Sequence, residues 1–280
     1  MKTIENVSFI RDPEVPGIEI SRVVESSHRF PRHFHDDIYG IGLMEKGASY
    51  CMGPEQDHTL VAAGNINLIN PGQVHSGVPA GRQVTYTMMY VTTARMTELS
   101  RSLFDGAGRL PEFRTLVVDD PVLFMKLKGL MNRFGPLIDP VEKESALVEA
   151  FTELLSAHGG MPGIETGKTP EPGVVSAARD FLSDRLEEKI SLTQAAEVTG
   201  LSRYHFLRVF RKQTGLPPHT YRTIKRVDAA RRFLKQGMPP AQVALETGFS
   251  DQSHFTTTFR QYLGVTPKHY LGTSHALKAI

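Results

Sequence analysis

The sequence predicts an α+β protein of two domains, with a β-rich domain in the first 120 residues and an all-α domain in the last third. Three observations predict this fold class. Short apolar stretches separated by glycines fill residues 1–120, a helical pattern occurs twice near the C-terminal end, and a segment rich in Gly and Pro lies between them. With 280 residues, 40% of them hydrophobic, the chain is long enough to bury two cores.

The N-terminal domain is expected to consist of short strands. Apolar residues alternate or run together at Ile38–Leu43, Ile66–Ile69 and Val84–Val91, and glycines or Pro71-Gly72 punctuate them. Frequent turns between short strands predict a β-sandwich or β-barrel over residues 1–120. The only cysteine, Cys51, is interpreted as a small core residue in one of these strands.

Two helices are expected next, at Pro121–Phe134 and Asp139–Ala157. The second carries a stripe with nearly heptad spacing: Val141, Glu144, Leu147, Val148, Phe151, Leu154 and Leu155. Such a stripe suits an antiparallel coiled coil between two copies of the chain. It suits packing onto the chain's own β domain equally well.

Residues 159–173, GGMPGIETGKTPEPG, contain five Gly and three Pro with hardly an apolar anchor. This composition predicts a flexible linker. Residues 174–280 are then the C-terminal domain. They hold 16 Lys and Arg against 8 Asp and Glu, whereas residues 1–173 hold 16 against 22. A basic module is typical of proteins that bind nucleic acid, because clustered cations release counterions from phosphates.

The C-terminal domain contains one pattern twice, at Ala195–Tyr221 and Val243–Tyr270. Gly200 and Ser202 match Gly248 and Ser250 at an offset of 48, so one residue is gained after the serine of the second copy. The remaining matches have an offset of 49: His205/His254, Phe206/Phe255, Phe210/Phe259, Arg211/Arg260, Gly215/Gly264, Pro218/Pro267 and Tyr221/Tyr270. Two copies are too few for a solenoid.

The first copy predicts a helix, a tight turn and a second helix. Ser191 suits the N-cap of a helix that runs to Thr199. Gly200 supplies a left-handed turn, and Ser202 caps the second helix. The apolar positions of this helix share one face: Phe206, Val209 and Phe210. Its opposite face is basic and aromatic: Arg203, Tyr204, Leu207, Arg208, Arg211 and Lys212.

The second copy predicts the same arrangement. Pro239 or Pro240 starts a helix to Thr247, Gly248 makes the turn, and Ser250 caps a helix with Phe255 and Phe259 inside. The solvent-facing positions are Asp251, Gln252, Ser253, Thr256, Thr257 and Arg260. Both copies have the layout of a helix-turn-helix whose second helix enters the major groove of DNA.

A helix is also expected between the copies. Pro217 and Pro218 suit its start, Thr220–Gln236 keeps a helical apolar rhythm, and Gly237 ends it. At about 1.5 Å per residue this helix is roughly 25 Å long. A strut of that length can hold two reading helices near the ~34 Å spacing of successive major grooves.

The duplicated motif, above all GFSDQSHFTTTFRQYLGVTPKHY, resembles the AraC-type (AraC/XylS) transcriptional regulators over about residues 174–272. The resemblance implies double-stranded DNA and a second copy of the chain as partners, with residues 121–158 as dimerisation helices. It implies base contacts at Arg203, Tyr204, Leu207, Arg208, Gln252, Ser253, Thr256 and Thr257. Phosphate contacts are expected at Ser202, Arg211, Lys212, Ser250 and Arg260.

The run RHFHDDIYGIGLMEKG, followed by AAGNINLINPGQVHSG, resembles the cupin-like effector-binding domain of many such regulators. His33 and His35 share a strand face, and His75 can converge on them from another strand. Metal-dependent cupins add a glutamate shortly after the second histidine, where this chain has Asp36 and Asp37 instead. We therefore expect no cofactor and interpret the histidines as polar groups of a ligand pocket, with a bound metal as the alternative.

A small-molecule effector is expected to contact polar groups among apolar walls. The candidates are His33, His35, Tyr39, Tyr50, Asn67, His75, Tyr86, Met88 and Tyr90, with Asn70 beside them. The expected function is sequence-specific transcription regulation in response to that effector, without enzymatic activity. One rival is a metal-dependent cupin enzyme with a DNA-binding tail, and another is an architectural DNA-binding protein without a ligand.

The remaining expectations concern the compartment. No apolar run reaches the 18 residues of a membrane span, and the N-terminal segment lacks the apolar core of a signal peptide. A single cysteine leaves no intrachain disulfide framework. These features predict a protein of the reducing cytoplasm.

Overall fold

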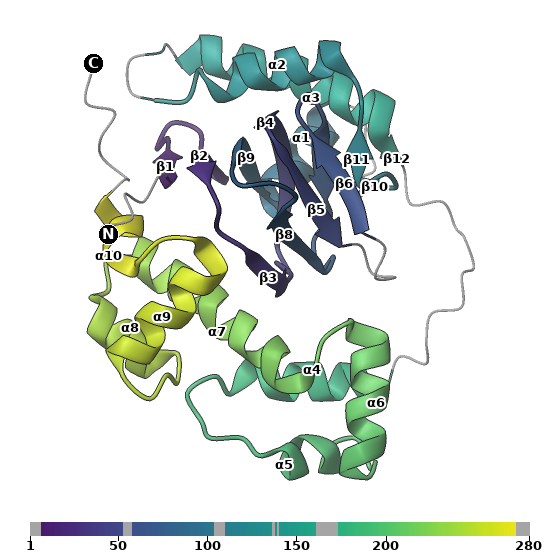
Figure 1. Ribbon diagram of the computed structural model, residues 1–280, viewed down its shortest axis with the longest axis vertical. Coiled ribbons are helices and arrows are strands. Elements are labelled where there is room, and N and C mark those ends of the chain that lie inside the picture. Colours follow the sequence, from purple (N-terminus) through teal and green to yellow (C-terminus); the bar gives the residue numbers. More distant parts are fainter. Residues whose placement is uncertain are drawn as a thin grey trace. The chain divides into compact units, whose positions relative to one another are not determined.

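The computed structural model describes residues 7–52, 58–103, 110–135, 138, 140–160 and 173–272 (Figure 1). The chain divides into two compact units. The first comprises residues 1–29, 34–165 and 272–280, and the second comprises residues 30–33 and 166–271. Among the helices within these described ranges, none is both long and apolar enough to cross a membrane.

Two main sheets form the β structure. The six-stranded sheet has the order β1 (Val7–Arg11), β2 (Ile18–Ser26), β9 (Val84–Thr92), β4 (Ile38–Lys46), β7 (Ile66–Ile69) and β11 (Val117–Val118). The four-stranded sheet has the order β3 (Phe30–His33), β8 (His75–Pro79), β5 (Ala48–Met52) and β6 (His58–Ala62). The predicted barrel is corrected to open sheets, because among the described strands β1 and β11 are edges and no pairing joins them.

The six-stranded sheet has two different faces, because side chains alternate along a strand. On β4, Tyr39, Ile41 and Leu43 lie in a large core together with buried residues of three helices. These helices are α1 (Thr93–Leu103), α2 (Pro121–Met131) and α3 (Pro140–His158). The opposite face carries Met44, which packs with Cys51 and Val61 of the four-stranded sheet. We call the region on this side, lined by Gly40, Gly42, Met44, Asn67, Tyr86, Met88 and Tyr90, the inter-sheet space.

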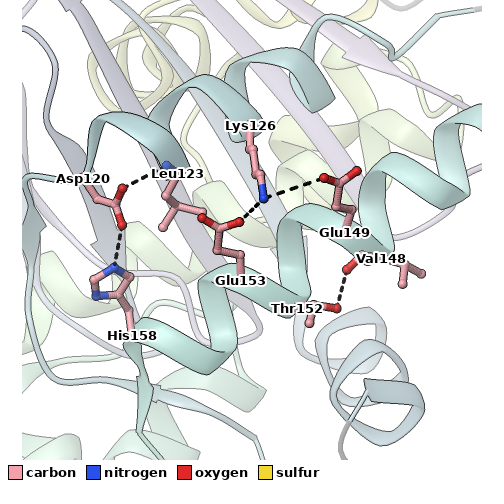
Figure 2. Close-up of polar contacts among 8 residues, drawn as sticks. All are labelled: Asp120, Leu123, Lys126, Val148, Glu149, Thr152, Glu153 and His158. Carbon is pink, nitrogen blue, oxygen red and sulfur yellow. Dashed lines mark hydrogen bonds and ion pairs between the residues drawn. The ribbon is translucent and has the colours of Figure 1, made fainter.

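Helices α2 and α3 are held together by polar contacts, shown in Figure 2. The Lys126 ammonium pairs with Glu153 and lies 3.7 Å from the Glu149 carboxylate, and these contacts raise its pKa. Asp120 caps α2 by accepting from the Leu123 amide at 2.9 Å, and its other oxygen lies 3.7 Å from His158 Nε2 at the end of α3. The two helices are therefore joined at the start and in the middle of α2.

The apolar stripe of α3 packs inside its own unit. Leu147, Phe151, Leu154 and Leu155 are all at most 4% exposed and belong to the core that includes β4 and β9. Val148 is 41% exposed, and the side chain of Val141 lies outside the described residues. Of the two interpretations of this stripe, packing onto the chain's own β domain is the one observed.

The first residues of the expected linker are paired. β12 (Gly159–Gly160) forms a short antiparallel ladder with β10 (Glu112–Phe113). Residues 161–172, the rest of that segment, lie outside the described residues.

The second unit is helical apart from β3. Its helices are α4 (Val174–Asp184), α5 (Leu192–Glu197), α6 (Arg203–Thr214), α7 (Pro218–Lys235), α8 (Pro240–Glu246), α9 (Gln252–Leu263) and α10 (Pro267–Gly272). The 18-residue α7 lies between the pair α5 and α6 and the pair α8 and α9, and contacts α4, α6, α8 and α9 (Figure 1). At 1.5 Å per residue α7 is about 27 Å long.

Two arginines of α7 hold the loop that follows α4. Arg222 donates to the Arg185 carbonyl at 2.6 Å and to the Glu188 carbonyl, while Arg226 Nε donates to the Leu186 carbonyl at 2.8 Å. Burial lowers the pKa of both guanidinium groups, and that of Arg226 falls to about 10. Part of the positive charge counted in this domain therefore serves its fold.

Candidate nucleic-acid interface and ligand site

The first helix-turn-helix unit consists of α5, the turn at Gly200 and α6. Ser191 and Gln194 form a capping box at α5, in which the Ser191 hydroxyl accepts from the Gln194 amide at 3.2 Å and Gln194 Oε1 accepts from the Ser191 amide at 2.8 Å. Gly200 has φ +67°, the left-handed turn that the sequence predicts. Ser202 caps α6 as expected, accepting from the His205 amide at 3.4 Å.

The second unit consists of α8, the turn at Gly248 with φ +73°, and α9. Its cap corrects the sequence interpretation, because Asp251, not Ser250, is the N-cap and accepts from the His254 amide at 2.7 Å. Ser250 instead donates to Asp251 Oδ2 at 2.9 Å. The residue gained in the second copy therefore precedes the cap, and Ser202 corresponds to Asp251.

Both units have the same aromatic core. In the first, Phe206 lies 5.4 Å from Phe210, and Phe210 lies 5.4 Å from Tyr221, measured between ring centroids. In the second, Phe255, Phe259 and Tyr270 make the corresponding contacts at 5.4 and 5.5 Å. Edge-to-face rings at these separations fix how each second helix is rotated, so its opposite side faces solvent.

The expected DNA-contacting residues lie on that opposite side. On and before α6, the exposed ones are Ser202, Arg203, Leu207, Arg208, Arg211 and Lys212. On and before α9, they are Ser250, Gln252, Ser253, Thr257 and Arg260, while Thr256 is half-buried. Tyr204 lies in α6, and its side chain is outside the described residues.

One exposed residue of α9, His254, was not among the predicted DNA contacts. His254 lies one helical turn before Thr257 and stacks edge-on against Phe249, with ring centroids 5.3 Å apart. Its alignment with His205 in the first copy is the signal that could have singled it out.

The inter-sheet space is defined by strand register. Gly42 pairs with Met88 on one side and with Asn67 on the other, and Gly40 pairs with Tyr90. Residues paired directly across antiparallel strands point to the same face. One face of the sheet therefore carries four of the residues expected to contact the effector: Asn67, Tyr86, Met88 and Tyr90.

Two glycines leave room that Met88 fills. A Cβ atom on Gly42 would lie 2.5 Å from Met88 Sδ, and one on Gly40 would lie 3.2 Å from Ile69 Cδ1 and 3.3 Å from Met88 Cε. A methionine side chain is flexible and polarizable, so a ligand can displace it at small cost. The alternation Gly40-Ile41-Gly42 within a strand was the signal for this space, which sequence reasoning did not use.

Asn67 lies at the boundary between the two sheets. Its Nδ2 contacts Cys51 Sγ at 3.9 Å, while its Oδ1 is buried without a hydrogen-bond partner among the described residues. A buried amide oxygen of this kind favours a ligand that can donate a hydrogen bond. Burial raises the pKa of the Cys51 thiol, which disfavours the reactive thiolate.

Three of the other candidates lie elsewhere. Tyr39 belongs to the core on the helix side, where its hydroxyl donates to the Pro111 carbonyl at 2.8 Å and burial raises its pKa to about 12. Tyr50 is 41% exposed on β5, opposite Leu60, which is also exposed. The Asn70 amide is bonded to both the N–H and the carbonyl of Phe113, at 2.9 and 2.8 Å.

The three histidines converge. His33, His35 and His75 are buried, and one potential metal-binding atom from each lies within 4.8 Å of the others. The rings of His35 and His75 are 5.6 Å apart, and His35 stands edge-on to Tyr90 at 6.1 Å. Asp37, which could have replaced the glutamate of metal-dependent cupins, is exposed and is not part of this group.

Comparison with known proteins identifies two domains in the chain. Residues 15–155 match the AraC-like ligand binding domain, and residues 195–273 match a helix-turn-helix domain. The uncharacterized HTH-type transcriptional regulator YbfI of Bacillus subtilis (strain 168) is 33% identical over 245 residues, which is 87% of each chain. The multiple antibiotic resistance protein MarA of Escherichia coli (strain K12) is 33% identical over 96 residues, covering 34% of this chain and 76% of MarA.

The fold resembles that of a solved two-domain protein. ToxT from Vibrio cholerae strain SCE256, in a crystal structure with a bound unsaturated fatty acid, has a TM-score of 0.57 to this chain at 14% identity. The likeness covers 98% of this chain and 96% of ToxT.

Proposed function

The chain belongs to the AraC-type family of transcription regulators, and from this premise we propose that α6 and α9 are the helices that read DNA bases. The family membership makes it a regulator with a ligand-binding domain and a helix-turn-helix DNA-binding domain, not an enzyme. DNA and a small-molecule effector are the partners that these two domains imply. Because the DNA of a bacterial-type regulator lies in the cytoplasm, we propose that compartment for the protein.

The observation that carries the proposal is the duplicated exposed face. The N-terminal halves of α6 and α9 expose Arg208 and Gln252 among polar neighbours, while aromatic residues anchor the opposite face. Arginine and glutamine are side chains that pair with guanine and adenine edges in the major groove. The length of α7 suits two grooves on one face of the DNA.

We assign the two kinds of contact by position. Base contacts are proposed for Arg203, Tyr204, Leu207, Arg208, Gln252, Ser253, Thr256 and Thr257. Phosphate contacts are proposed for Ser202, Arg211, Lys212, Ser250 and Arg260, which lie at the helix starts or nearer the helix ends.

Two arginines one turn apart test this assignment. Arg208→Ala is expected to weaken binding to the cognate site by about 1 to 3 kcal/mol and to relax specificity at one base pair. Arg211→Ala is the matched control, since it is expected to weaken binding to all DNA and reduce the salt dependence. Fluorescence anisotropy on the operator and on scrambled DNA measures both, and equal losses on the two DNAs for Arg208→Ala would exclude base reading.

For the effector we propose the inter-sheet space, with Asn67, Tyr86, Met88 and Tyr90 on its wall and His35 and His75 at one side. What supports it is the buried Asn67 oxygen without a described partner and the room next to two glycines, filled by a flexible methionine. ToxT, a fold relative, was crystallised with an unsaturated fatty acid, which is in keeping with a ligand in this type of domain.

A thermal-shift screen with sugars, amino acids, aromatic acids and fatty acids tests the effector site, since a ligand that binds the folded state raises stability by mass action. Asn67→Leu is expected to abolish the shift given by a hit. Tyr50→Phe, on the outer side of β5, is the control and should keep it. Retention of the shift by Asn67→Leu would place the effector elsewhere.

We also propose that two copies associate through the outer side of α2 and α3. Val122 and Met125 of α2 are 63% and 65% exposed, and Val148 of α3 is 41% exposed, beside the ion pairs of Lys126. Exposed apolar side chains on adjacent helices favour association with a second copy of that surface. Met125→Glu should then shift the sedimentation coefficient toward the monomer, whereas Val24→Glu, at another exposed apolar position, should not.

A further inference from the structure

The loop between α4 and α5 is bonded to two arginines of α7 that lie one helical turn apart. Arg222 donates to the carbonyl of Arg185, at 2.6 Å, and to that of Glu188. Arg226 donates through Nε to the Leu186 carbonyl at 2.8 Å and through Nη2 to the Glu188 carbonyl at 3.3 Å. Hydrogen bonds from a charged donor are roughly twice as strong as neutral ones. Both guanidinium groups therefore fix the path of this loop along α7.

The same loop packs against the turn of the second helix-turn-helix unit. A Cβ atom on Gly248 would lie 2.1 Å from the Leu186 carbonyl oxygen and 2.6 Å from Arg226 Nη2. Arg226 Cζ lies 5.9 Å from the centroid of the Phe249 ring, within the range of a cation–π contact. The Phe249 ring in turn lies 5.3 Å from that of Phe255, in the aromatic core of the second unit. Arg226 therefore contacts both the loop that leads into α5 and the turn that leads into α9.

We propose that Arg222 and Arg226 set the orientation of α6 relative to α9, and with it the spacing of the two DNA half-sites that one chain accepts. The inference rests on the proposed function of α6 and α9 as the helices that read DNA. Each unit has its own aromatic core, which fixes how its reading helix is rotated within that unit. The two arginines act between the units. They are positioning residues, because Arg222 is 9% exposed and both guanidinium groups are bonded to protein backbone.

The loop adds a second connection between the two units. The first connection is α7 itself, which packs directly against α6, α8 and α9. One additional base pair between two half-sites moves the second half-site by about 3.4 Å along the DNA axis and by about 35° around it. Reading helices held by both connections therefore fit one spacing. Helices joined by α7 alone can follow such a change at a smaller loss of affinity.

The experiment uses the full-length chain and an operator that this chain selects from random duplex DNA. Two further duplexes lengthen or shorten the spacer between the half-sites by one base pair, and another keeps a single half-site. For the unaltered chain we expect about tenfold weaker binding when the spacer is altered, because simultaneous binding of two linked sites contributes about 10²- to 10⁴-fold in affinity. Fluorescence anisotropy gives the ratio of the affinities for the selected and the altered spacers.

Arg222→Ala and Arg226→Ala should each bind the selected operator about tenfold more weakly, and their spacer ratio should fall to about threefold or less. Affinity for the single half-site should stay within about twofold of the unaltered chain, because each unit keeps its own core. A general loss of stability leaves the spacer ratio unchanged, since both affinities are measured on one variant. The ratio therefore separates a positioning role from a merely structural one.

Two further variants complete the test. Arg226→Lys keeps the charge, but an ammonium group does not reproduce the planar fork of a guanidinium. It should lower the spacer ratio as alanine does, and it tests the proposal even where alanine prevents folding. Arg232→Ala removes a cation from an exposed position of the same helix and should keep the ratio of the unaltered chain.

An unchanged spacer ratio in Arg226→Lys and in both alanine variants, with parallel losses on every duplex, would overturn the proposal. The arginines would then contribute to stability alone. A failure of the proposed function gives a different result, because the unaltered chain itself would then show no dependence on the spacer. That result would overturn this inference together with the reading role of α6 and α9.

Discussion

The two helix-turn-helix units share a scaffold but differ in how each is built into the domain. Their second helices begin at caps 49 residues apart, end at glycines with φ +73° and +76°, and carry aromatic contacts that agree within 0.1 Å. The exposed faces differ, with Arg203 and Arg208 on α6 against Gln252 and Thr257 on α9. Duplication therefore preserved the residues that orient each reading helix and changed the residues that meet the solvent.

The turns also differ in their surroundings. A Cβ on Gly200 would meet nothing within 4 Å, whereas a Cβ on Gly248 would lie 2.1 Å from the Leu186 carbonyl oxygen. The loop that crowds Gly248 is the one held by Arg222 and Arg226. The second turn is thus packed against the loop after α4, while the first turn is exposed. Gly200 and Gly248 have the same conformation, but a side chain at position 248 would clash with backbone and one at position 200 would not.

The largest expected effect concerns these turns. Gly200→Ala should destabilise by about 1 kcal/mol, the cost of placing an alanine in the left-handed region. Gly248→Ala should add about 1 to 3 kcal/mol, because the new methyl group meets backbone that cannot yield cheaply. Urea unfolding of the full-length variants, followed by helix circular dichroism, measures both. Equal losses would show that the loop after α4 does not pack on this turn.

The next effect concerns DNA affinity. The first unit exposes more cations, so Arg208→Ala should weaken operator binding by about 1 to 3 kcal/mol. Gln252→Ala in the second unit should cost less, because an uncharged contact contributes less than a charge-assisted one. The operator affinity of both variants, measured across a salt titration, tests this difference. A larger loss of affinity for Gln252→Ala would mean that the second unit contributes more to DNA binding than the first.

A smaller effect on stability is expected for Tyr221 and Tyr270, the tyrosines of the two aromatic cores. Arg231 Nε donates to the Tyr270 hydroxyl at 3.4 Å, with Arg231 only 4% exposed, whereas Arg179, which donates to Tyr221 at 3.2 Å, is exposed. Tyr270→Phe should therefore cost about 1 kcal/mol, since a buried donor loses an acceptor. Tyr221→Phe should cost less, because water replaces the hydroxyl. Thermal unfolding of both variants provides the comparison.

The smallest expected effect is a difference between the N-caps of α9 and α6 in how their contribution to stability depends on pH. Hydrogen bonds from the His254 amide and the Ser250 hydroxyl hold the pKa of Asp251 below its usual value. The carboxylate cap therefore stabilises α9 fully above the unfolded pKa, about 3.9, and this contribution is lost as the pH falls toward the lowered pKa of the folded state. The difference in melting temperature between the unaltered chain and Asp251→Asn should change between pH 5 and pH 3, roughly across this interval. Ser202→Asn, at the cap of α6, should show no such change.

Local signals in the sequence determined much of this protein. Glycines at 200 and 248, serine caps at 191 and 202 and the aromatic spacing in both copies act within one or two helical turns, so they could be interpreted without a fold. The strands at 38–43, 66–69 and 84–91 were predicted for the same reason. Helix α1 was not predicted, because Met96, Leu99 and Leu103 are scattered among polar residues in a segment of 11 residues.

Only the tertiary structure decided which side of each element is used. Alternation shows that a strand has two faces but not which face meets the helices, so Tyr39 and Met88 could not be separated by sequence. Counting charge likewise could not separate Arg222, which bonds backbone carbonyls, from Arg208, which is exposed. The cap at Asp251 and the convergence of His35 with His75 depend on backbone conformation and on strands distant in sequence. Periodicity depends on residues that are neighbours in the sequence. The burial of a side chain and its approach to distant side chains depend on which other elements pack against it.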